Sequence, residues 1–598
     1  MNTKKIDFSI TNNPDSASGT YIRIIMMGLK YKLLLVLGII SIFFAVGFQL
    51  WMPILIGNGV ENISKIVTNS NQVDQSQFIL IGIYLLLASS MRGVFTGLYN
   101  YMGESIGQHI GYELRLLYYE KLQRLSFSYH SNIHSGDLIT RALLDIEGVS
   151  MFVRTAFLRT IFLILLLGIG MYMVINTDLV LGLLSLSFVP FAGWRSISTR
   201  LQLRTSWYKL QEKMSTLTKV MDENMAGIRV VRSFFSQKFE MRKFDKASKE
   251  TLNIANEQVE IRSINISLIS TSFLISMGLV IWIGGIKVIQ GNMTIGELAT
   301  FLAFMSILQA PVRMLGMMVN AFARGAASGG RLFAVLDMDP EIKESKNAKD
   351  LSNAKGILKF NNVNFGYEGE RTLTNINFEA TPGHTIGIVG PPGSGKSTIA
   401  HLIPRFYDPT SGSITIDNVD IKDITLESLR HLVSVVEQDS FLFTASIDQN
   451  VAYGNPWAED RDVEVATKNT QLYNYIANLP NKFNTMVGER GVSLSGGQRQ
   501  RLSIARSILL KPKIIIFDDS TSAVDAATEQ KIRIALREAT KSRTSIIISH
   551  RLSSLMHADE IIFFEFGKIQ ERGTHEELIS KGGKYSELYE LQIRPKVN

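Results

Sequence analysis

The chain has 598 residues, is 46% hydrophobic and carries a formal net charge of +8. It contains no cysteine, which excludes disulfides, iron–sulfur clusters, thiolate zinc sites and cysteine nucleophiles. The positive charge suits either nucleic acid or a membrane surface, and the positions of the basic residues decide between the two.

The N-terminal half is predicted to cross a membrane. Residues 1–20 form a polar tail, and residues 19–32 read either as a short interfacial helix or as the start of the first span. A crossing needs about 20 mostly apolar residues. Six candidate runs cover residues 33–56, 78–102, 155–175, 179–194, 266–289 and 295–319. The fourth run is short, and Pro311 and Arg313 interrupt the sixth. We predict an all-α transmembrane domain of six helices over residues 21–325.

Basic residues are concentrated in alternate connections between the spans. Residues 103–154 and 195–262 are rich in Lys and Arg, whereas residues 58–77 contain only Lys65. By the positive-inside rule, both termini lie in the cytoplasm of a multi-pass protein of the cytoplasmic membrane. This accounts for the net charge, so no nucleic-acid partner is expected. The two basic connections look helical throughout, so spans two to five should extend far into the cytoplasm.

The C-terminal half is predicted to be an α/β domain. A linker is expected over residues 326–355, followed by strand-like runs that alternate with helical patterns over residues 356–598. The strand-like runs cover residues 357–365, 384–390, 413–417, 432–436, 513–517, 544–550 and 560–565.

A phosphate-binding loop stands between a predicted strand and a predicted helix. The segment GPPGSGKS, from Gly390 to Ser397, fits the pattern G-x-x-x-x-G-K-[ST]. Gly393 and Gly395 would let backbone N–H groups turn toward phosphate oxygens, and Lys396 adds a full positive charge. The Ser397 hydroxyl can reach Mg²⁺.

A second motif, LSGGQ, opens a helical run about 100 residues later. Ser495, Gly496 and Gly497 offer a hydroxyl and unhindered backbone amides at a helix start, which is a second place able to hold phosphate. One nucleotide does not need two such loops in one chain. Two copies facing head-to-tail would let each loop complete the other chain's ATP site.

The phosphate loop, residues 494–498 and residues 514–518 together resemble an ATP-binding cassette. With six preceding spans and long cytoplasmic loops, nearly the whole chain resembles a half-transporter of the ABC exporter class (type IV fold). The fold implied is an all-α six-helix transmembrane domain followed by an α/β P-loop cassette. The resemblance also implies ATP and Mg²⁺ as cofactors and a second half-transporter as partner.

The resemblance further implies roles for individual residues. Tyr367 would stack on adenine. The other ATP-binding positions would be Gly390, Pro391, Pro392, Gly393, Ser394, Gly395, Lys396, Ser397 and Thr398. Mg²⁺ would be held by Ser397, Gln438 and Asp518. The catalytic positions would be Asp519, His550 and Gln438.

Across the dimer, the resemblance assigns the signature residues Ser495, Gly496, Gly497 and Gln498 to the partner's ATP, and Asp525 to a contact between the two cassettes. The ends of the cytoplasmic loops, near residues 135–137 and 227–235, would meet the cassette at residues 485–491.

Asp519 departs from the family pattern, which has glutamate. Its carboxylate falls short by roughly 1–1.5 Å if the backbone is fixed, and a misplacement of that size can cost about 10²-fold in rate. We expect slow hydrolysis at this chain's own site. Such a site favours a heterodimer with one slow and one active site, although the retained His550 leaves a slow homodimer open.

The function expected is ATP-driven export of lipophilic or amphipathic compounds by alternating access. A lipid flippase and an exporter-fold importer of a siderophore or vitamin remain as alternatives. A soluble cassette protein acting on DNA or ribosomes is disfavoured by the six spans.

Overall fold

The structure, a computed structural model, describes residues 17–68, 75–351, 353–367, 369–438, 440–488, 491, 494–518 and 534–593. The described chain divides into two compact units. The first contains the residues up to Gln123 and His134–Met338, and the second contains Arg124–Ile133 and the residues from Asp339 onward. The short segment Arg124–Ile133 therefore belongs to the same unit as the C-terminal half.

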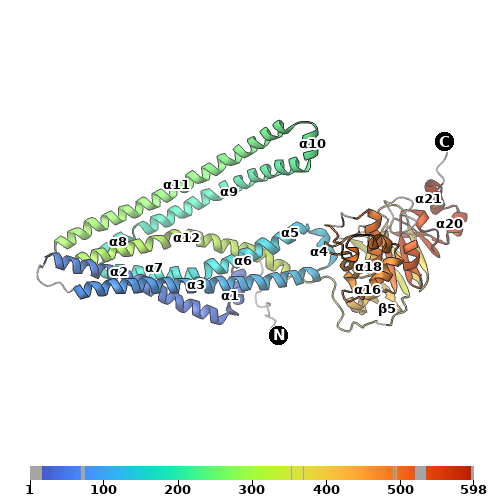
Figure 1. The fold of residues 1–598 in the computed structure, drawn as a ribbon, viewed down its shortest axis with the longest axis horizontal. Coiled ribbons are helices and arrows are strands. Elements are labelled where there is room, and N and C mark those ends of the chain that lie inside the picture. Colours follow the sequence, from blue (N-terminus) through green and yellow to red (C-terminus); the bar gives the residue numbers. More distant parts are fainter. Residues whose placement is uncertain are drawn as a thin grey trace. The chain divides into compact units, whose positions relative to one another are not determined.

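The elements described in the first unit are helices (Figure 1). Its α-helices are α1 (Ala17–Leu29), α2 (Lys32–Thr68), α3 (Gln75–Arg124), α5 (Ser135–Thr140), α6 (Ile146–Phe152), α7 (Leu158–Thr177), α8 (Leu179–Leu186), α9 (Phe188–Ala226), α10 (Ile228–Ser233), α11 (Gln237–Ile289) and α12 (Ile295–Leu336). Two short π-helices, η1 (Arg141–Asp145) and η2 (Val153–Phe157), flank α6. The helix α1 is separate from α2, so residues 19–32 are not simply the start of the first span.

Five helical stretches among the described residues are long and apolar enough to cross a membrane. They are Lys32–Ile66, Ser76–Arg124, Ser135–Thr177, Leu179–Ala226 and Gln237–Ile289, and each contains one of the first five predicted spans. The sixth predicted span begins α12, but its apolar helix Ile295–Pro311 is shorter than the other five. Helix α12 itself continues past Pro311 to Leu336, inside the segment predicted as a linker.

Several helices are much longer than a bilayer is thick. Helix α3 has 50 residues and α11 has 53, which corresponds to roughly 75–80 Å at 1.5 Å per residue. A hydrocarbon core is about 30 Å thick. Helices α3 and α11 are thus longer than one bilayer crossing requires; their extension into the cytoplasm stays a prediction. In Figure 1, α9 and α11 run together as a long hairpin closed by α10.

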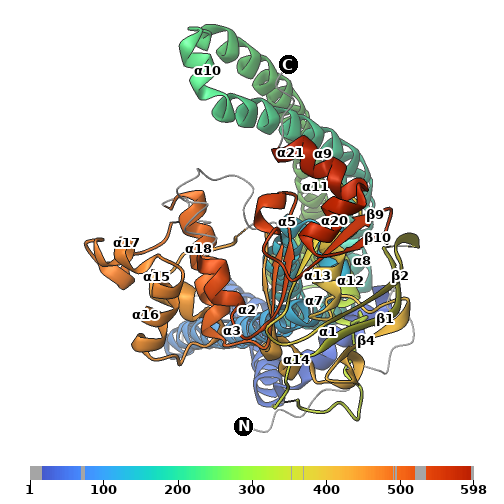
Figure 2. The ribbon, with the colours of Figure 1, turned by 90° about the vertical axis from the view of Figure 1, so that its right-hand side faces the viewer.

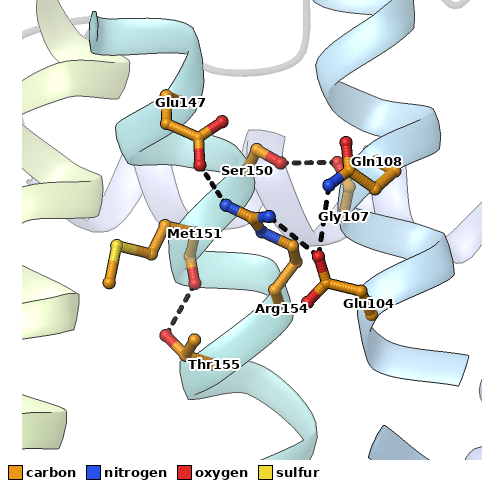
Figure 3. A network of polar contacts seen from close by, with 8 residues as sticks. All are labelled: Glu104, Gly107, Gln108, Glu147, Ser150, Met151, Arg154 and Thr155. Carbon is orange, nitrogen blue, oxygen red and sulfur yellow. Dashed lines mark hydrogen bonds and ion pairs between the residues drawn. The ribbon is translucent and has the colours of Figure 1, made fainter. Parts of the chain in front are cut away.

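A polar network joins α3 to α6 and η2 (Figure 3). The Arg154 guanidinium donates to Glu104 on α3 at 2.8 Å and also pairs with Glu147 on α6. The Ser150 hydroxyl donates to the backbone oxygen of Gly107 at 2.8 Å. A Cβ at Gly107 would collide with Cγ of Arg154, so this glycine permits the close approach of the two helices.

The second unit contains two β-sheets (Figure 2). A four-stranded antiparallel sheet has the order β2-β1-β4-β5, and a six-stranded sheet has the order β10-β9-β3-β8-β7-β6. The strands are β1 (Leu358–Tyr367), β2 (Glu370–Ala380), β3 (Thr385–Val389), β4 (Ser411–Ile416), β5 (Val419–Asp420), β6 (Val433–Val436), β7 (Ile514–Asp518), β8 (Thr544–Ile548), β9 (Glu560–Glu565) and β10 (Lys568–Gly573). The seven predicted strand runs are confirmed as β1, β3, β4, β6, β7, β8 and β9, whereas β2, β5 and β10 were not predicted.

The helices of the second unit fall into groups around these sheets. Its described α-helices are α4 (Phe127–Asn132), α13 (Lys396–Leu402), α14 (Leu426–Leu432), α15 (Ile447–Val451), α16 (Asp460–Asn469), α17 (Tyr473–Ala477), α18 (Gly496–Leu509), α20 (His575–Lys581) and α21 (Lys584–Ile593). Helices α15 to α18 form a helical subdomain with its own buried core, and Figure 2 shows it on one side of the sheets. The predicted α/β class of this half is confirmed.

Candidate nucleotide-binding site

The phosphate loop connects the central strand β3 to α13. Strand β3 pairs in parallel with β8 and β9, and Gly390 follows its last residue. Gly393 and Gly395 have φ of 76° and 97°, a left-handed conformation that favours glycine. A Cβ at Gly395 would lie 2.8 Å from Cδ2 of Leu373, so both the backbone and the available space favour glycine there. The motif thus has the strand and helix flanks that a phosphate loop requires.

Lys396 is a buried cation held inside this loop. Its side chain is only 5% exposed. The ammonium donates to the backbone oxygens of Gly390 at 3.0 Å and Pro391 at 2.8 Å, and to the Ser394 hydroxyl at 3.3 Å. These three acceptors are neutral oxygens. A buried ammonium in a loop of this kind is a group that suits a polyphosphate.

Ser397 and Asp518 lie together beside the loop. The Ser397 hydroxyl donates to Oδ1 of Asp518 at 3.1 Å, and Asp518, the last residue of β7, is 7% exposed. Hard oxygen donors of this type fit Mg²⁺, which is usually held by one or two carboxylates together with phosphate oxygens. No group of three or more His, Cys, Asp or Glu side chains gathers in the described parts of the chain. Mg²⁺ held by Ser397 and Asp518 would take its remaining ligands from Gln438, nucleotide oxygens and water.

Tyr367 lies close to the same loop. Its hydroxyl donates to Oγ1 of Thr398 at 3.4 Å, and its half-buried ring meets Phe365 and Tyr407 edge-on at 4.8 and 5.2 Å between centroids. Burial raises the pKa of Tyr367 above its ordinary value, so the phenol is neutral at physiological pH. The fold thus places the residue predicted to contact adenine beside the first turn of α13.

Gln438 and His550 follow the carboxyl ends of two further strands. Gln438 lies two residues after β6, and His550 lies two residues after β8. Strands β3, β8, β7 and β6 are neighbours and run parallel. Their carboxyl ends therefore meet at one edge of the sheet, which is where open α/β sheets bind ligands. This edge brings both positions to the side of the sheet that carries Gly390 and Asp518.

The signature motif is built into a different part of the domain. Ser495 caps α18: its hydroxyl accepts from the Gln498 backbone N–H at 3.3 Å, and the Gln498 side chain accepts from the Ser495 backbone N–H at 2.8 Å. The space beside Gly496 is open. Helix α18 packs on α15, α16 and β6, whereas α13 packs on β7, and Figure 2 shows α13 and α18 apart. The structure therefore does not bring the signature to the phosphate loop of its own chain.

Arg506 connects the signature helix to the segment that follows Gln438. Its guanidinium donates to the backbone oxygens of Phe441 at 3.0 Å and Asn450 at 2.8 Å, and it lies over the rings of Phe443 and Tyr453. Burial lowers the pKa of Arg506 from its ordinary value, although an arginine remains charged. A displacement of α18 would therefore move residues 441–443 through these contacts of Arg506.

Two predicted site residues, Asp519 and Asp525, lie outside the described residues. The predicted segment 485–491 is described except for residues 489 and 490. It runs beside residues 445–447, because the Ile447 N–H donates to Thr485 O at 3.0 Å and the Val487 N–H donates to Ala445 O at 2.9 Å.

Several structural contacts near the site were not predicted from the sequence. The backbone N–H of Gly567, after β9, donates to Ser394 O at 3.2 Å. The cytoplasmic-loop segment inside the cassette unit is Arg124–Ile133, just before the expected residues 135–137, which belong to the first unit and start α5. The resemblance implied a loop end near residues 135–137, which lie in α5. Only the aromatic residues of FSYHSN in α4 could have indicated that this segment belongs with the cassette, and aromatic residues are common in helices.

Comparison with known proteins identifies the family to which both halves of the chain are similar. The family described as "ABC transporter transmembrane region" matches residues 33–312, and the family described as "ABC transporter" matches residues 373–522. The chain is 39% identical to the uncharacterized ABC transporter ATP-binding protein YknU of Bacillus subtilis, over 84% of this chain and 86% of that protein. It is 35% identical to the ATP-dependent lipid A-core flippase of Desulfotalea psychrophila, over 84% and 88%.

Two further comparisons cover almost the whole chain. A Staphylococcus aureus protein, named provisionally as a multidrug export ATP-binding/permease protein, is 34% identical over 94% of this chain and 98% of its own length. A solved structure of a bacterial Atm1-family ABC exporter with ATP bound matches with a TM-score of 0.76 and 27% identity, over 94% of this chain and 99% of that one. The chain therefore belongs to the ABC transporter family, as an exporter-type half-transporter with a multi-span membrane domain and a cytoplasmic ATPase domain.

Proposed function

We propose that this chain is one half of an ATP-driven exporter of lipophilic or amphipathic compounds, which works as a dimer by alternating access. The names of two relatives, a lipid A-core flippase and a multidrug export protein, support this class of cargo. ATP, with Mg²⁺ on Ser397, Gln438 and Asp518, would supply the energy by phosphoryl transfer to water.

The observation that carries the proposal is the place of α4 in the unit formed by the cassette. The ring of Phe127 stacks on that of Phe406 with centroids 4.1 Å apart, and the Ser128 hydroxyl donates to Glu341 at 2.5 Å. Phe406 lies four residues after α13, which begins at Lys396, and α4 follows α3 in the chain. A movement of the phosphate loop can thus pass through one ring contact to a 50-residue helix of the membrane domain.

A second chain is needed to complete the nucleotide site. The signature at Ser495 begins α18, which does not pack on α13 of its own chain. In a head-to-tail dimer the signature of one chain would cover the phosphate loop of the other. The open space beside Gly496 and its backbone amide suit close approach by a phosphate.

Exposed aromatic residues support a further contact between the two chains. At the tip of the α9–α11 hairpin, Phe234 and Phe235 are 77% and 82% exposed. On the helical subdomain, Phe441, Tyr453 and Met486 are also exposed. Large exposed apolar side chains that cluster in this way mark interaction sites. We assign the hairpin tip of one chain to this surface of the partner's cassette, where Arg506 would connect the contact to the signature helix.

We also propose that this chain's own site hydrolyses ATP slowly. Asp519 stands where the family has glutamate, and its shorter side chain would hold the attacking water poorly. ATP binding by Gly390–Ser397 and Asp518 would be unaffected. The intact LSGGQ motif could complete an active site on a different partner chain, which favours a heterodimer over a slow homodimer.

A lipid flippase is the second candidate, and it is favoured by the name of the Desulfotalea relative. The complex can be purified through a tag on this chain, which retains any partner, and reconstituted into lipid nanodiscs. We expect Mg²⁺-dependent ATP hydrolysis that a lipophilic cationic dye or a phospholipid stimulates. Stimulation that depends on the lipid headgroup would favour the flippase, and stimulation by the dye would favour drug export. Hydrolysis that no lipid or dye alters would count against both.

A further inference from the structure

We propose that Gln592, in the last turn of α21, is a positioning residue for His550. This inference rests on the proposed function, in which His550 contacts the γ-phosphate of ATP. Gln592 lies 42 residues further along the chain and matches no motif.

The carboxamide of Gln592 holds the backbone of the turn that carries His550. Its Nε2 donates to the backbone oxygen of His550 at 2.8 Å, and its Oε1 accepts from the backbone N–H of Leu552 at 3.0 Å. One side chain thus satisfies two backbone groups on either side of Arg551. This pair of bonds restricts φ and ψ of Arg551 and fixes the orientation of the peptide unit that carries the His550 carbonyl, to which the Cα and side chain of His550 are attached.

Two further hydrogen bonds hold the backbone of this turn. The backbone N–H of Ser549 donates to Ile388 O of β3 at 3.2 Å, and the Ser549 hydroxyl accepts from the backbone N–H of Arg551 at 3.0 Å. The first bond connects the turn to the strand that precedes the phosphate loop. Gln592 bonds the same turn from its C-terminal side, at His550 and Leu552.

Helix α21 is anchored well enough to serve as a reference for this turn. Tyr585, in its first turn, is fully buried and its hydroxyl lies 2.8 Å from Nδ1 of His575. The backbone N–H of Lys584 donates to Glu571 at 2.6 Å. Tyr585 and Leu552 belong to the same buried cluster, and Leu588 packs against it. The helix and the His550 turn therefore share one core.

The position of Gln592 explains why its loss should affect one phosphate group selectively. Adenine, the other phosphates and Mg²⁺ are assigned to Tyr367, the phosphate loop and Asp518, none of which Gln592 touches among its described bonds. Among the residues assigned to ATP in the described chain, His550 is the one whose backbone Gln592 bonds. A shift of about 1 Å in a contacting group is enough to weaken its interaction strongly, so ATP and ADP binding should respond differently.

The test measures ATP and ADP binding at this chain's own site in the full complex. Azido-ATP and azido-ADP are photocrosslinked on ice with Mg²⁺, and labelling of this chain is read after separation by size. The variants are Gln592→Leu, Gln592→Glu, His550→Ala and the Gln592→Leu/His550→Ala double variant. Leu591→Ala is the matched control, because Leu591 is the neighbouring residue and is 78% exposed.

We expect Gln592→Leu to weaken ATP labelling roughly tenfold, the effect of losing one hydrogen bond to a charged group, with ADP labelling unchanged. Gln592→Glu, which places a carboxylate oxygen against the His550 carbonyl, should act in the same direction. In the double variant, ATP labelling should equal that of His550→Ala alone, because Gln592 acts through His550. If Gln592→Leu disturbed the domain in general, the double variant would label more weakly than His550→Ala.

Equal losses for ATP and ADP, a full additional loss in the double variant, or unchanged ATP labelling in both Gln592 variants would overturn the inference. If Gln592→Leu does not fold, Gln592→Glu carries the same test. Wild-type labelling of Lys396→Ala would instead refute the ATP-site assignment on which the proposed function rests.

Discussion

The hydroxyl of Ser397 donates a 3.1 Å hydrogen bond to Oδ1 of Asp518 and so joins the phosphate loop to the end of β7. The two residues are 121 positions apart in the chain. Their contact brings a hydroxyl and a carboxylate to the same point beside the buried Lys396, which is where we propose that Mg²⁺ binds.

Replacing Asp518 by Asn should separate metal binding from nucleotide binding. The amide keeps the shape of the side chain but removes the negative charge that Mg²⁺ requires. We expect Mg²⁺-dependent hydrolysis to fall by about 10²-fold or more, while ATP labelling without Mg²⁺ is retained. Asp423→Asn, an exposed position in the same domain, serves as the control. Unaltered hydrolysis in Asp518→Asn would argue against this metal site, as would full wild-type hydrolysis in excess EDTA.

Replacing Lys396 by Ala should weaken ATP binding at this chain's site. The variant loses the only full positive charge assigned to the phosphates, and a charge-assisted contact of this kind is worth about 1.5–3 kcal/mol. Affinity should fall about 10- to 100-fold, measured by photolabelling of this chain. Lys568→Ala, at an exposed position on β10, should bind like the wild type. Equal ATP affinity in Lys396→Ala and wild type would refute the assignment.

Replacing Asp519 by Glu should raise turnover at this chain's site. The added methylene extends the carboxylate toward the attacking water, so we expect roughly 10- to 100-fold faster hydrolysis. Turnover is measured on the purified complex, with Asp518→Glu as the matched control, because the same change one residue earlier should give no gain. Brisk hydrolysis by a homodimer of the wild-type chain, without improvement in Asp519→Glu, would contradict the slow-site proposal.

Replacing Phe127 by Ala should uncouple the two domains. The ring contact with Phe406 is lost, and a pair of this kind contributes about 0.5–1.5 kcal/mol. ATP binding and basal hydrolysis should persist, because Phe127 lies outside the nucleotide site, but stimulation of hydrolysis by lipid or dye should disappear. Phe127→Tyr keeps the ring and should retain the stimulation. Normal stimulation in Phe127→Ala would show that this contact does not transmit the signal.

The fold could be predicted from the sequence where apolar periodicity was strong. Strands buried on both faces, such as β7 and β8, show continuous apolar runs. Strand β2 did not, because a bulge separates its inward residues Leu373 and Ile376 by three positions and breaks the period of two. Strand β10 is an edge strand without a fully buried residue, so its sequence lacks an apolar pattern.

The candidate site was predictable where short motifs carry it. Gly390–Ser397 and Ser495–Gln498 each fold as a local strand-to-helix or loop-to-helix unit, so their spacing alone predicts their conformation. The contacts of Gln592 with His550 and of Phe127 with Phe406 are long-range and involve common residue types. No local pattern specifies such pairs, so only the structure could show them.

The most direct test of ATP-driven export is the direction of movement of a lipophilic probe. The complex, purified through this chain, is reconstituted into liposomes with a fluorescent phospholipid and, separately, a lipophilic cationic dye, and Mg²⁺–ATP is added outside. Complexes whose ATPase domain faces outward should then move at least one probe toward the lumenal side, and the Lys396→Ala complex should not. Movement of the probes outward from the lumen would contradict export. So would probe movement that is the same in samples with ATP as in samples without it, provided that the samples with ATP hydrolyse it.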